Sequence, residues 1–226
     1  MKLTLAEKEN LTDNVWSFRF EADPAQHWTA GQYIQVELPH SRPDAEGTKR
    51  YFTVSAAPFE ELIQITTRVT ESTFKQALVN LPAGGEMKLL MAPDGDFGWE
   101  QSARPKVFVA AGIGITPYRS MLAQREHEGR PLDVTLVYAN RTDQVPFRAE
   151  FDRYAAEDRG FKVHYLTGLV TEEDLRELLP DLMEALIYIS GPEPLVETMG
   201  DTLRASGLPE KQIKQDFFPN YSAKNF

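Results

Sequence analysis

The sequence predicts a two-domain protein, an N-terminal antiparallel β-barrel followed by a C-terminal α/β domain with a parallel sheet. Three observations lead to this fold class. The first hundred residues contain apolar runs with a period of two. After Pro105, short and nearly continuous apolar runs alternate with helical stretches. A turn with two glycines links the first of those runs to a helix. We expect domains at 1–100 and 101–226, joined near residues 99–105.

The strands of the first domain are recognised by their alternation. Trp16, Phe18 and Phe20 alternate with polar residues, and the same pattern recurs in YIQVEL (33–38) and LIQITTRV (62–69). Because alternate residues of a strand point to opposite faces, each run buries one face of an antiparallel sheet. One short helix is expected at 73–80.

The second domain is predicted from strand–helix alternation. The expected strands are 107–111, 134–139, 163–166 and 186–190, and helices are expected around 117–128, 147–158, 172–183 and 194–206. Thr171 and Asp174 resemble a capping box with Asp in the last place, which marks the start of the third helix.

Composition excludes several classes of protein. The chain of 226 residues is 42% apolar, has a net charge of −10 and contains no cysteine. The acidic balance disfavours nucleic acid or an anionic membrane as partner, and the lack of cysteine excludes disulfides and a thiol nucleophile. No stretch approaches the roughly 20 apolar residues of a membrane span. We therefore expect a cytoplasmic protein without a membrane span.

The glycine turn is the first candidate for chemistry. Gly112 and Gly114 directly follow a strand, and Thr116 with Pro117 opens a helix, an arrangement that presents backbone N–H groups to a phosphate. A full dinucleotide fingerprint has a third glycine at position 117 and an acid after the next strand. Here that strand ends in Asn140-Arg141, and a guanidinium suits a 2′-phosphate. A tight turn that needs glycine only for packing remains the alternative.

Arg50, Phe52 and Thr53 form the second candidate. They combine a cation, an aromatic ring and a hydroxyl, and Thr73 opens the short helix nearby, where N–H groups could receive a diphosphate. An ordinary solvated arginine next to a core phenylalanine is the alternative interpretation. Four scattered histidines give no metal-ligand spacing, so no metal site is expected. No G-x-S-x-G elbow supports a hydrolase.

Read in order, the motifs resemble those of the ferredoxin–NADP reductase family. The resemblance covers essentially the whole chain, through RYFTVS (50–55), TTRVTESTFKQAL (66–78), APDGDF (92–97), GIGITP (112–117), YANRT (138–142) and SGPEP (190–194). It implies an FAD-binding barrel followed by a nicotinamide-nucleotide domain. The chain is similar to a stand-alone reductase module without fused iron–sulfur or haem domains.

On the flavin side, the resemblance implies roles by position. Arg50 matches the arginine that binds the FAD diphosphate, Phe52 the aromatic against the isoalloxazine, and Thr53 the hydroxyl near flavin N5. Many relatives have Tyr in place of Phe52. Further matches are the strand along the flavin and the start of the diphosphate-binding helix, formed by Thr66, Arg68, Thr73, Phe74 and Lys75; Lys75 stands where many relatives have Ser.

On the nicotinamide side, Gly112, Gly114 and Thr116 match the pyrophosphate turn, and Asn140 with Arg141 the adenosine contact. The turn that positions the nicotinamide is matched by Gly191, Pro192 and Glu193, and Ser190 precedes it where many relatives have Cys. The C-terminal QDFFPNY resembles the tail that returns to the flavin. Asp216 takes the place of the family's acidic residue, and Phe217, Phe218 and Tyr221 are the candidates to shield the ring.

The resemblance implies a reductase that moves a hydride from NADPH, with NADH as the alternative, to FAD. Electrons then pass to an external acceptor such as ferredoxin or flavodoxin. Thr53, Ser190 and Asp216 are the expected residues beside the reacting rings. The alternatives are a flavin or ferric reductase, and a subunit that works only in a larger electron-transfer complex.

Overall fold

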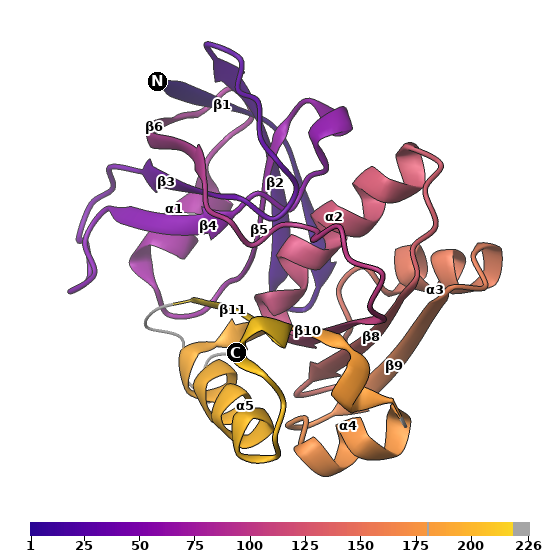
Figure 1. The fold of residues 1–226 in the computed structure, drawn as a ribbon. Coiled ribbons are helices and arrows are strands. Elements are labelled where there is room, and N and C mark those ends of the chain that lie inside the picture. Colours follow the sequence, from indigo (N-terminus) through magenta and orange to yellow (C-terminus); the bar gives the residue numbers. More distant parts are fainter. Residues whose placement is uncertain (180, 219–226) are drawn as a thin grey trace. The chain divides into compact units, whose positions relative to one another are not determined.

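The computed structural model describes residues 1–179 and 181–218, and it divides into two compact units. The first unit comprises Met1–Trp99 and Thr116–His127, and the second comprises Glu100–Ile115 and the residues from Glu128 on. Figure 1 colours the residues of both units by their place in the sequence.

A six-stranded antiparallel sheet forms the first unit. Its strands follow the order β4-β3-β6-β1-β2-β5. Their bounds are β1 (Lys2–Thr12), β2 (Val15–Asp23), β3 (Tyr33–Glu37), β4 (Lys49–Thr53), β5 (Ile63–Arg68) and β6 (Glu86–Asp94). The two edge strands meet through one bridge between Val54 and Ile65, next to a 2.9 Å hydrogen bond from Ser55 N to Gln64 O. The sheet is therefore barrel-like, as predicted.

The predicted alternation fills the core of this unit. Phe18, Phe20, Ile34 and Val36 are fully buried. Helix α1 (Thr73–Asn80) has the predicted bounds and adds Phe74 to the same cluster. Because one face of each strand is apolar, the side chains meet inside the sheet and water is excluded.

Helix α2 (Thr116–His127) belongs to the first unit, although it follows the first strand of the second. Arg119 donates to both carboxylate oxygens of Glu60, in the short 3₁₀ helix η1 (Pro58–Glu60). Ser120 Oγ donates to Ala56 O at 2.6 Å, and the rings of Phe59 and His127 stack with centroids 4.0 Å apart. The sequence placed this helix with the C-terminal domain. The functional division at residues 100 and 101 stays a prediction.

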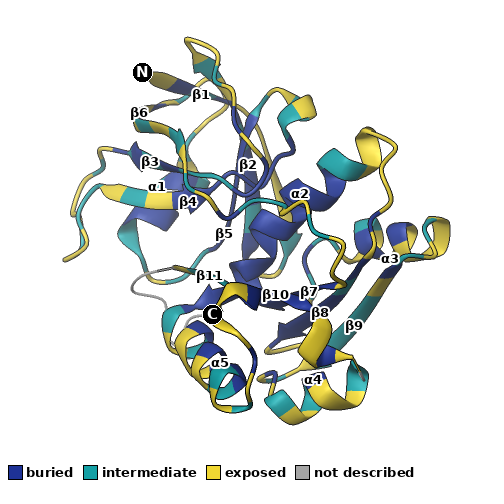
Figure 2. Ribbon diagram, in the orientation of Figure 1, coloured by how far each residue is buried: buried dark blue, intermediate teal, exposed yellow. Residues whose placement is uncertain are grey.

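The second unit is a five-stranded parallel sheet in the order β11-β10-β7-β8-β9. Its strands are β7 (Lys106–Ala111), β8 (Val134–Asn140), β9 (Phe161–Thr167), β10 (Leu186–Pro192) and β11 (Ile213–Phe218). Its helices are α3 (Arg148–Glu157), α4 (Glu172–Leu178) and α5 (Glu193–Ala205), with 3₁₀ turns η2 (Gly112–Ile115), η3 (Leu182–Glu184) and η4 (Glu210–Gln212). Figure 2 shows β7 and β10 buried along their length, while α5 has an exposed outer face.

The predicted fold class is confirmed, and the capping box is present. Asp174 N donates to Thr171 Oγ1 at 3.1 Å, and Thr171 N donates to the Asp174 carboxylate at 2.8 Å. Helix α4 is shorter than expected, since it ends at Leu178 where the sequence predicted residue 183. Pro180 disfavours helical geometry at the residue before it. None of the helices in the described ranges is long and apolar enough to cross a membrane.

We expect Glu60→Gln to loosen helix α2. The Glu60 and Arg119 side chains are 14% and 10% exposed, so Glu60→Gln removes the negative charge from a largely buried ion pair. The free energy of unfolding should fall by about 2–4 kcal/mol, measured by urea denaturation. Glu61→Gln makes the same charge change at an exposed neighbour and should shift it by less than about 0.5 kcal/mol. Equal effects would contradict this role.

Candidate functional site

Strand β4 positions the first group of predicted residues. Phe52 and Thr53 are buried, whereas Tyr51 between Arg50 and Phe52 is 51% exposed. The Phe52 ring packs against Phe74 of α1, with centroids 5.9 Å apart, and the Arg50 guanidinium lies 5.2 Å from the centre of the Phe74 ring. The structure therefore brings Arg50 and Phe52 together beside Phe74 of α1.

Arg50 is bound on every nitrogen by its own segment. Its Nη1 donates to the carbonyl oxygens of Glu46, Gly47 and Lys49, at 2.8–3.1 Å. Its Nη2 donates to Asp44 Oδ1 at 3.0 Å, and Nε forms an ion pair with Glu46 at 3.0 Å. These bonds hold the guanidinium in one orientation beside α1.

Asp44 and His40, which the sequence motifs did not single out, contact Thr73 at the start of α1. Asp44 Oδ2 accepts from Thr73 N at 3.0 Å, and Thr73 Oγ1 accepts from Asp44 N at 3.0 Å. His40 Nε2 lies 3.0 Å from the same hydroxyl. Burial acts to raise the pKa of Asp44, but the hydrogen bonds from Thr73 and Arg50 outweigh it and lower that pKa. Asp44 is thus an anion held by a helix N-terminus and an arginine.

Strand β5 carries Thr66 and Arg68, both buried. The Thr66 hydroxyl bonds to Ser17 Oγ at 2.7 Å and to Ser55 Oγ at 2.8 Å, so it belongs to a hydroxyl cluster inside the unit. Arg68 Nη1 donates to Asn14 Oδ1 at 2.7 Å. The Thr66 hydroxyl is therefore already bound inside the unit, and the predicted flavin contact of this strand stays a prediction. Lys75, also buried, follows Phe74 on α1.

In the second unit, the glycine turn follows β7 as 3₁₀ helix η2. Gly112 has a φ of +55°, a conformation that favours glycine. At Gly114, a Cβ atom would lie 2.0 Å from the carbonyl oxygen of Ser190, so only glycine permits this approach to β10. Thr116, the next predicted contact, is buried as the first residue of α2 in the other unit.

Asn140 ends β8 at the carboxyl edge of the sheet. The residue is 1% exposed, and neither its amide nitrogen nor its amide oxygen has a hydrogen-bond partner among the described residues. A buried amide without partners costs free energy, so this side chain fits a polar ligand that both donates and accepts. Arg141 next to it is exposed. In open parallel sheets, ligands bind beyond the carboxyl ends of the strands.

The predicted nicotinamide turn lies at the same edge. Ser190, Gly191 and Pro192 end β10 and are buried, and Glu193 begins α5. Ser190 pairs with Asp216 of the parallel strand β11, and Ser190 Oγ donates to Asp216 Oδ2 at 3.1 Å. Burial raises the pKa of Asp216 to about 6, although the Ser190 hydroxyl acts to lower it.

The predicted tail is described only in part. Phe217 is 46% exposed. Tyr221 lies outside the described residues, as does the side chain of Phe218, so their assigned role stays a prediction. No group of three or more metal-ligating side chains occurs in the ranges 1–179 and 181–218.

Comparisons with known proteins show what the chain is similar to. Residues 108–201 match the model of the oxidoreductase NAD-binding domain. The chain is 29% identical to a flavohemoprotein of Burkholderia sp. (strain TH2), over 97% of this chain and 59% of that protein. It is 26% identical to the ferredoxin reductase component of 3-ketosteroid-9-alpha-monooxygenase from Mycobacterium tuberculosis (strain H37Rv), over 100% and 67%. The chain thus spans less than two thirds of the flavohemoprotein that it matches.

The fold agrees with these similarities. The FAD/NAD-binding domain of nitric oxide dioxygenase from Vibrio cholerae superposes with a TM-score of 0.82 at 23% identity, over 96% of this chain and 98% of that one. The barrel-like sheet followed by a parallel-sheet unit with a glycine turn is the fold that this chain shares with that FAD/NAD-binding domain. The match over residues 108–201 and the shared fold agree with the resemblance of the motifs to the ferredoxin–NADP reductase family.

We expect Asp216 to make stability depend on pH. Its pKa in the folded protein, about 6, lies above the usual value near 3.9, so the folded state binds more protons than the unfolded state between about pH 4 and 6. Stability should therefore fall as pH rises through this window, and the full penalty should be present above pH 6. Relative to wild type, Asp216→Asn should gain about 2 kcal/mol between pH 4 and 7 in urea denaturation.

The adjacent hydroxyl provides the matched control. Ser190→Ala removes the bond that acts to lower the pKa of Asp216, so the window should extend to higher pH. A stability difference between Asp216→Asn and wild type that stays constant from pH 4 to 7 would contradict the assignment.

Proposed function

We propose that the chain is an FAD-containing reductase that accepts a hydride from NADPH, with NADH as the alternative donor, and passes electrons to an external redox partner. The observation that carries the proposal is Asn140, whose buried amide has no partner among the described residues. It lies at the carboxyl edge of the sheet, where β7 leads into the glycine turn. A nucleotide supplies donors and acceptors of the kind that this amide lacks.

In this proposal the protein binds and orients, and the cofactor supplies the redox chemistry. FAD, when bound, accepts two electrons as a hydride and can release them one at a time. Arg50 and the first amide of α1 bind its diphosphate. Phe52 packs against the ring system, and Thr53 contacts its edge. Lys75 adds a positive charge near the diphosphate.

The remaining predicted residues act on the nicotinamide nucleotide. Gly112 and Gly114 let the pyrophosphate approach the backbone, and Asn140 with Arg141 binds the adenosine half. Gly191, Pro192 and Glu193 form the turn beside the nicotinamide, where Ser190 and Asp216 hold the ring in place. Hydride transfer requires the donor carbon of the nicotinamide and the acceptor nitrogen of the flavin to lie about 3–3.5 Å apart, and these residues would provide that positioning.

The acceptor is proposed from the relatives. A ferredoxin reductase component of a monooxygenase is among them, which supports a redox protein such as ferredoxin or flavodoxin as the partner. A second candidate is a reductase that releases reduced flavin, and the ion pairs of Arg50 with Asp44 and Glu46 favour it, because they occupy the proposed diphosphate ligand. A ferric reductase, or a subunit of a larger electron-transfer complex, would use the same flavin site.

Arg50→Ala tests the flavin site. Loss of the guanidinium should lower FAD affinity about 10- to 100-fold, because charge-assisted bonds to a phosphate contribute roughly 1.5–3 kcal/mol. The measurement is a titration of FAD by fluorescence quenching. Lys88→Ala removes a cation whose side chain is 66% exposed on β6 and should leave the affinity unchanged. An unchanged FAD affinity in Arg50→Ala would refute the diphosphate assignment.

Arg141→Ala tests the choice of coenzyme. The guanidinium suits a 2′-phosphate, which NADPH has and NADH lacks. We expect KM for NADPH to rise at least about 10-fold while KM for NADH stays within about 2-fold. Arg153→Ala, a cation on α3 that pairs with Glu157, is the control of equal charge change. Equal losses for both coenzymes would remove the argument for the 2′-phosphate.

A further inference from the structure

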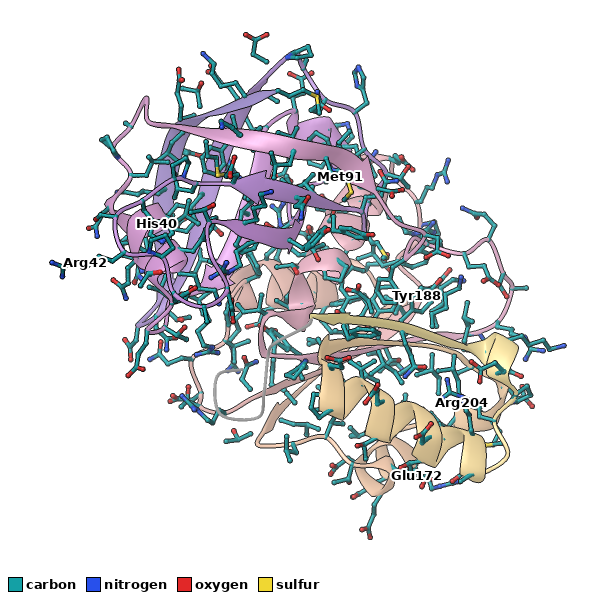
Figure 3. The ribbon with its side chains drawn as sticks, turned by 90° about the vertical axis from the view of Figure 1, so that its left-hand side faces the viewer. His40, Arg42, Met91, Glu172, Tyr188 and Arg204 are labelled. Carbon is teal, nitrogen blue, oxygen red and sulfur yellow. The ribbon has the colours of Figure 1, made fainter. Side chains whose placement is uncertain are left out.

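The segment from Pro39 to Thr48, between β3 and β4, crosses the start of helix α1. Asp44 is its central contact: one carboxylate oxygen accepts from Thr73 N and the other from Arg50 Nη2, each at 3.0 Å. His40, in the same segment, lies 3.0 Å from the Thr73 hydroxyl. Figure 3 shows Arg42 extending away from the protein, so this cation is directed outward.

The two donors that hold Asp44 are of the kind that binds phosphate. A first-turn amide of a helix and an arginine guanidinium favour an anion through the helix dipole and through charge-assisted hydrogen bonds. They are also the donors that the proposed function gives to the flavin diphosphate. The Asp44 carboxylate therefore accepts hydrogen bonds from the same two donors that a bound flavin phosphate needs.

The charge balance opposes simultaneous binding. Asp44 and Glu46 both pair with Arg50, so two negative charges already surround one guanidinium. A diphosphate at the same donors would add negative charge next to these carboxylates, and like charges at contact distance repel each other. The Asp44 carboxylate must therefore move away from Thr73 N and Arg50 before a phosphate can bind both donors.

We propose that Asp44 sets the flavin affinity of the site by competing, as an internal anion, with the flavin phosphate for Thr73 N and Arg50. This inference rests on the proposed function, since it concerns the same flavin site. Phosphate-bearing flavins then bind more weakly and exchange faster than they do without the carboxylate. Riboflavin has no phosphate, so its binding does not depend on Asp44.

The experiment compares wild type with Asp44→Asn. The Asn amide oxygen can still accept from Thr73 N, and Asn is as good a helix-capping residue as Asp, so the fold is retained while the charge is lost. FAD, FMN and riboflavin are each titrated by fluorescence. We expect the dissociation constants of FAD and FMN to fall at least 10-fold and that of riboflavin to stay within 2-fold.

Glu86→Gln is the matched control. It removes one carboxylate charge from β6 in the same unit, where Glu86 pairs with Lys2 at 2.9 Å, and it should change none of the three affinities. If Asp44→Asn does not fold, Asp44→Ser repeats the test, because its hydroxyl also accepts from a helix amide without a charge.

Three results would overturn the inference while the proposed function stands: wild type binds FAD and Asp44→Asn binds it equally, or more weakly, or the variant gains as much for riboflavin as for FAD. If neither wild type nor variant binds any flavin, the proposed function fails together with the inference. The two failures are therefore distinguishable.

Discussion

The hydrogen-bonded ion pair between Arg119 and Glu60 joins helix α2 to the barrel-like unit. It holds helix α2 in the first unit, while the glycine turn just before this helix in the chain belongs to the second unit. The turn is itself fixed within its unit, because Gly114 approaches the Ser190 carbonyl too closely for any side chain. The last residue of the turn, Ile115, is therefore followed by a helix that belongs to the barrel-like unit.

Much of the fold could be predicted from the sequence because burial is periodic. Alternation in VWSFRF and YIQVEL places Phe18, Phe20, Ile34 and Val36 in the core, where the structure has them. Continuous apolar runs predicted the parallel strands, because a parallel sheet covered on both faces buries every residue of a strand. The membership of α2 could not be predicted, since it depends on Arg119 and Glu60, which lie 59 residues apart in the sequence. Local patterns carry no signal for such a pair.

The motifs identified some residues of the candidate site and missed others. Motif order singled out Arg50, Thr73, Gly114 and Asn140, and their roles toward a nucleotide stay predictions. Asp44 and His40 were missed because their contacts to Thr73 span 29 and 33 residues. The acid six residues before Arg50 was the one signal available, and without the fold it reads as part of a solvated turn. The hydrogen bonds of the Thr66 hydroxyl could not be predicted either, because its partners Ser17 and Ser55 lie on other segments.

Anaerobic absorption spectroscopy tests the central claim most directly. The purified protein is supplied with FAD, freed of unbound flavin, and mixed with NADPH or NADH without oxygen. We expect at least one nucleotide to bleach the flavin band, because the proposed reductase transfers a hydride from that nucleotide to FAD. A bound flavin that neither nucleotide reduces, or a protein that retains no flavin, would contradict it.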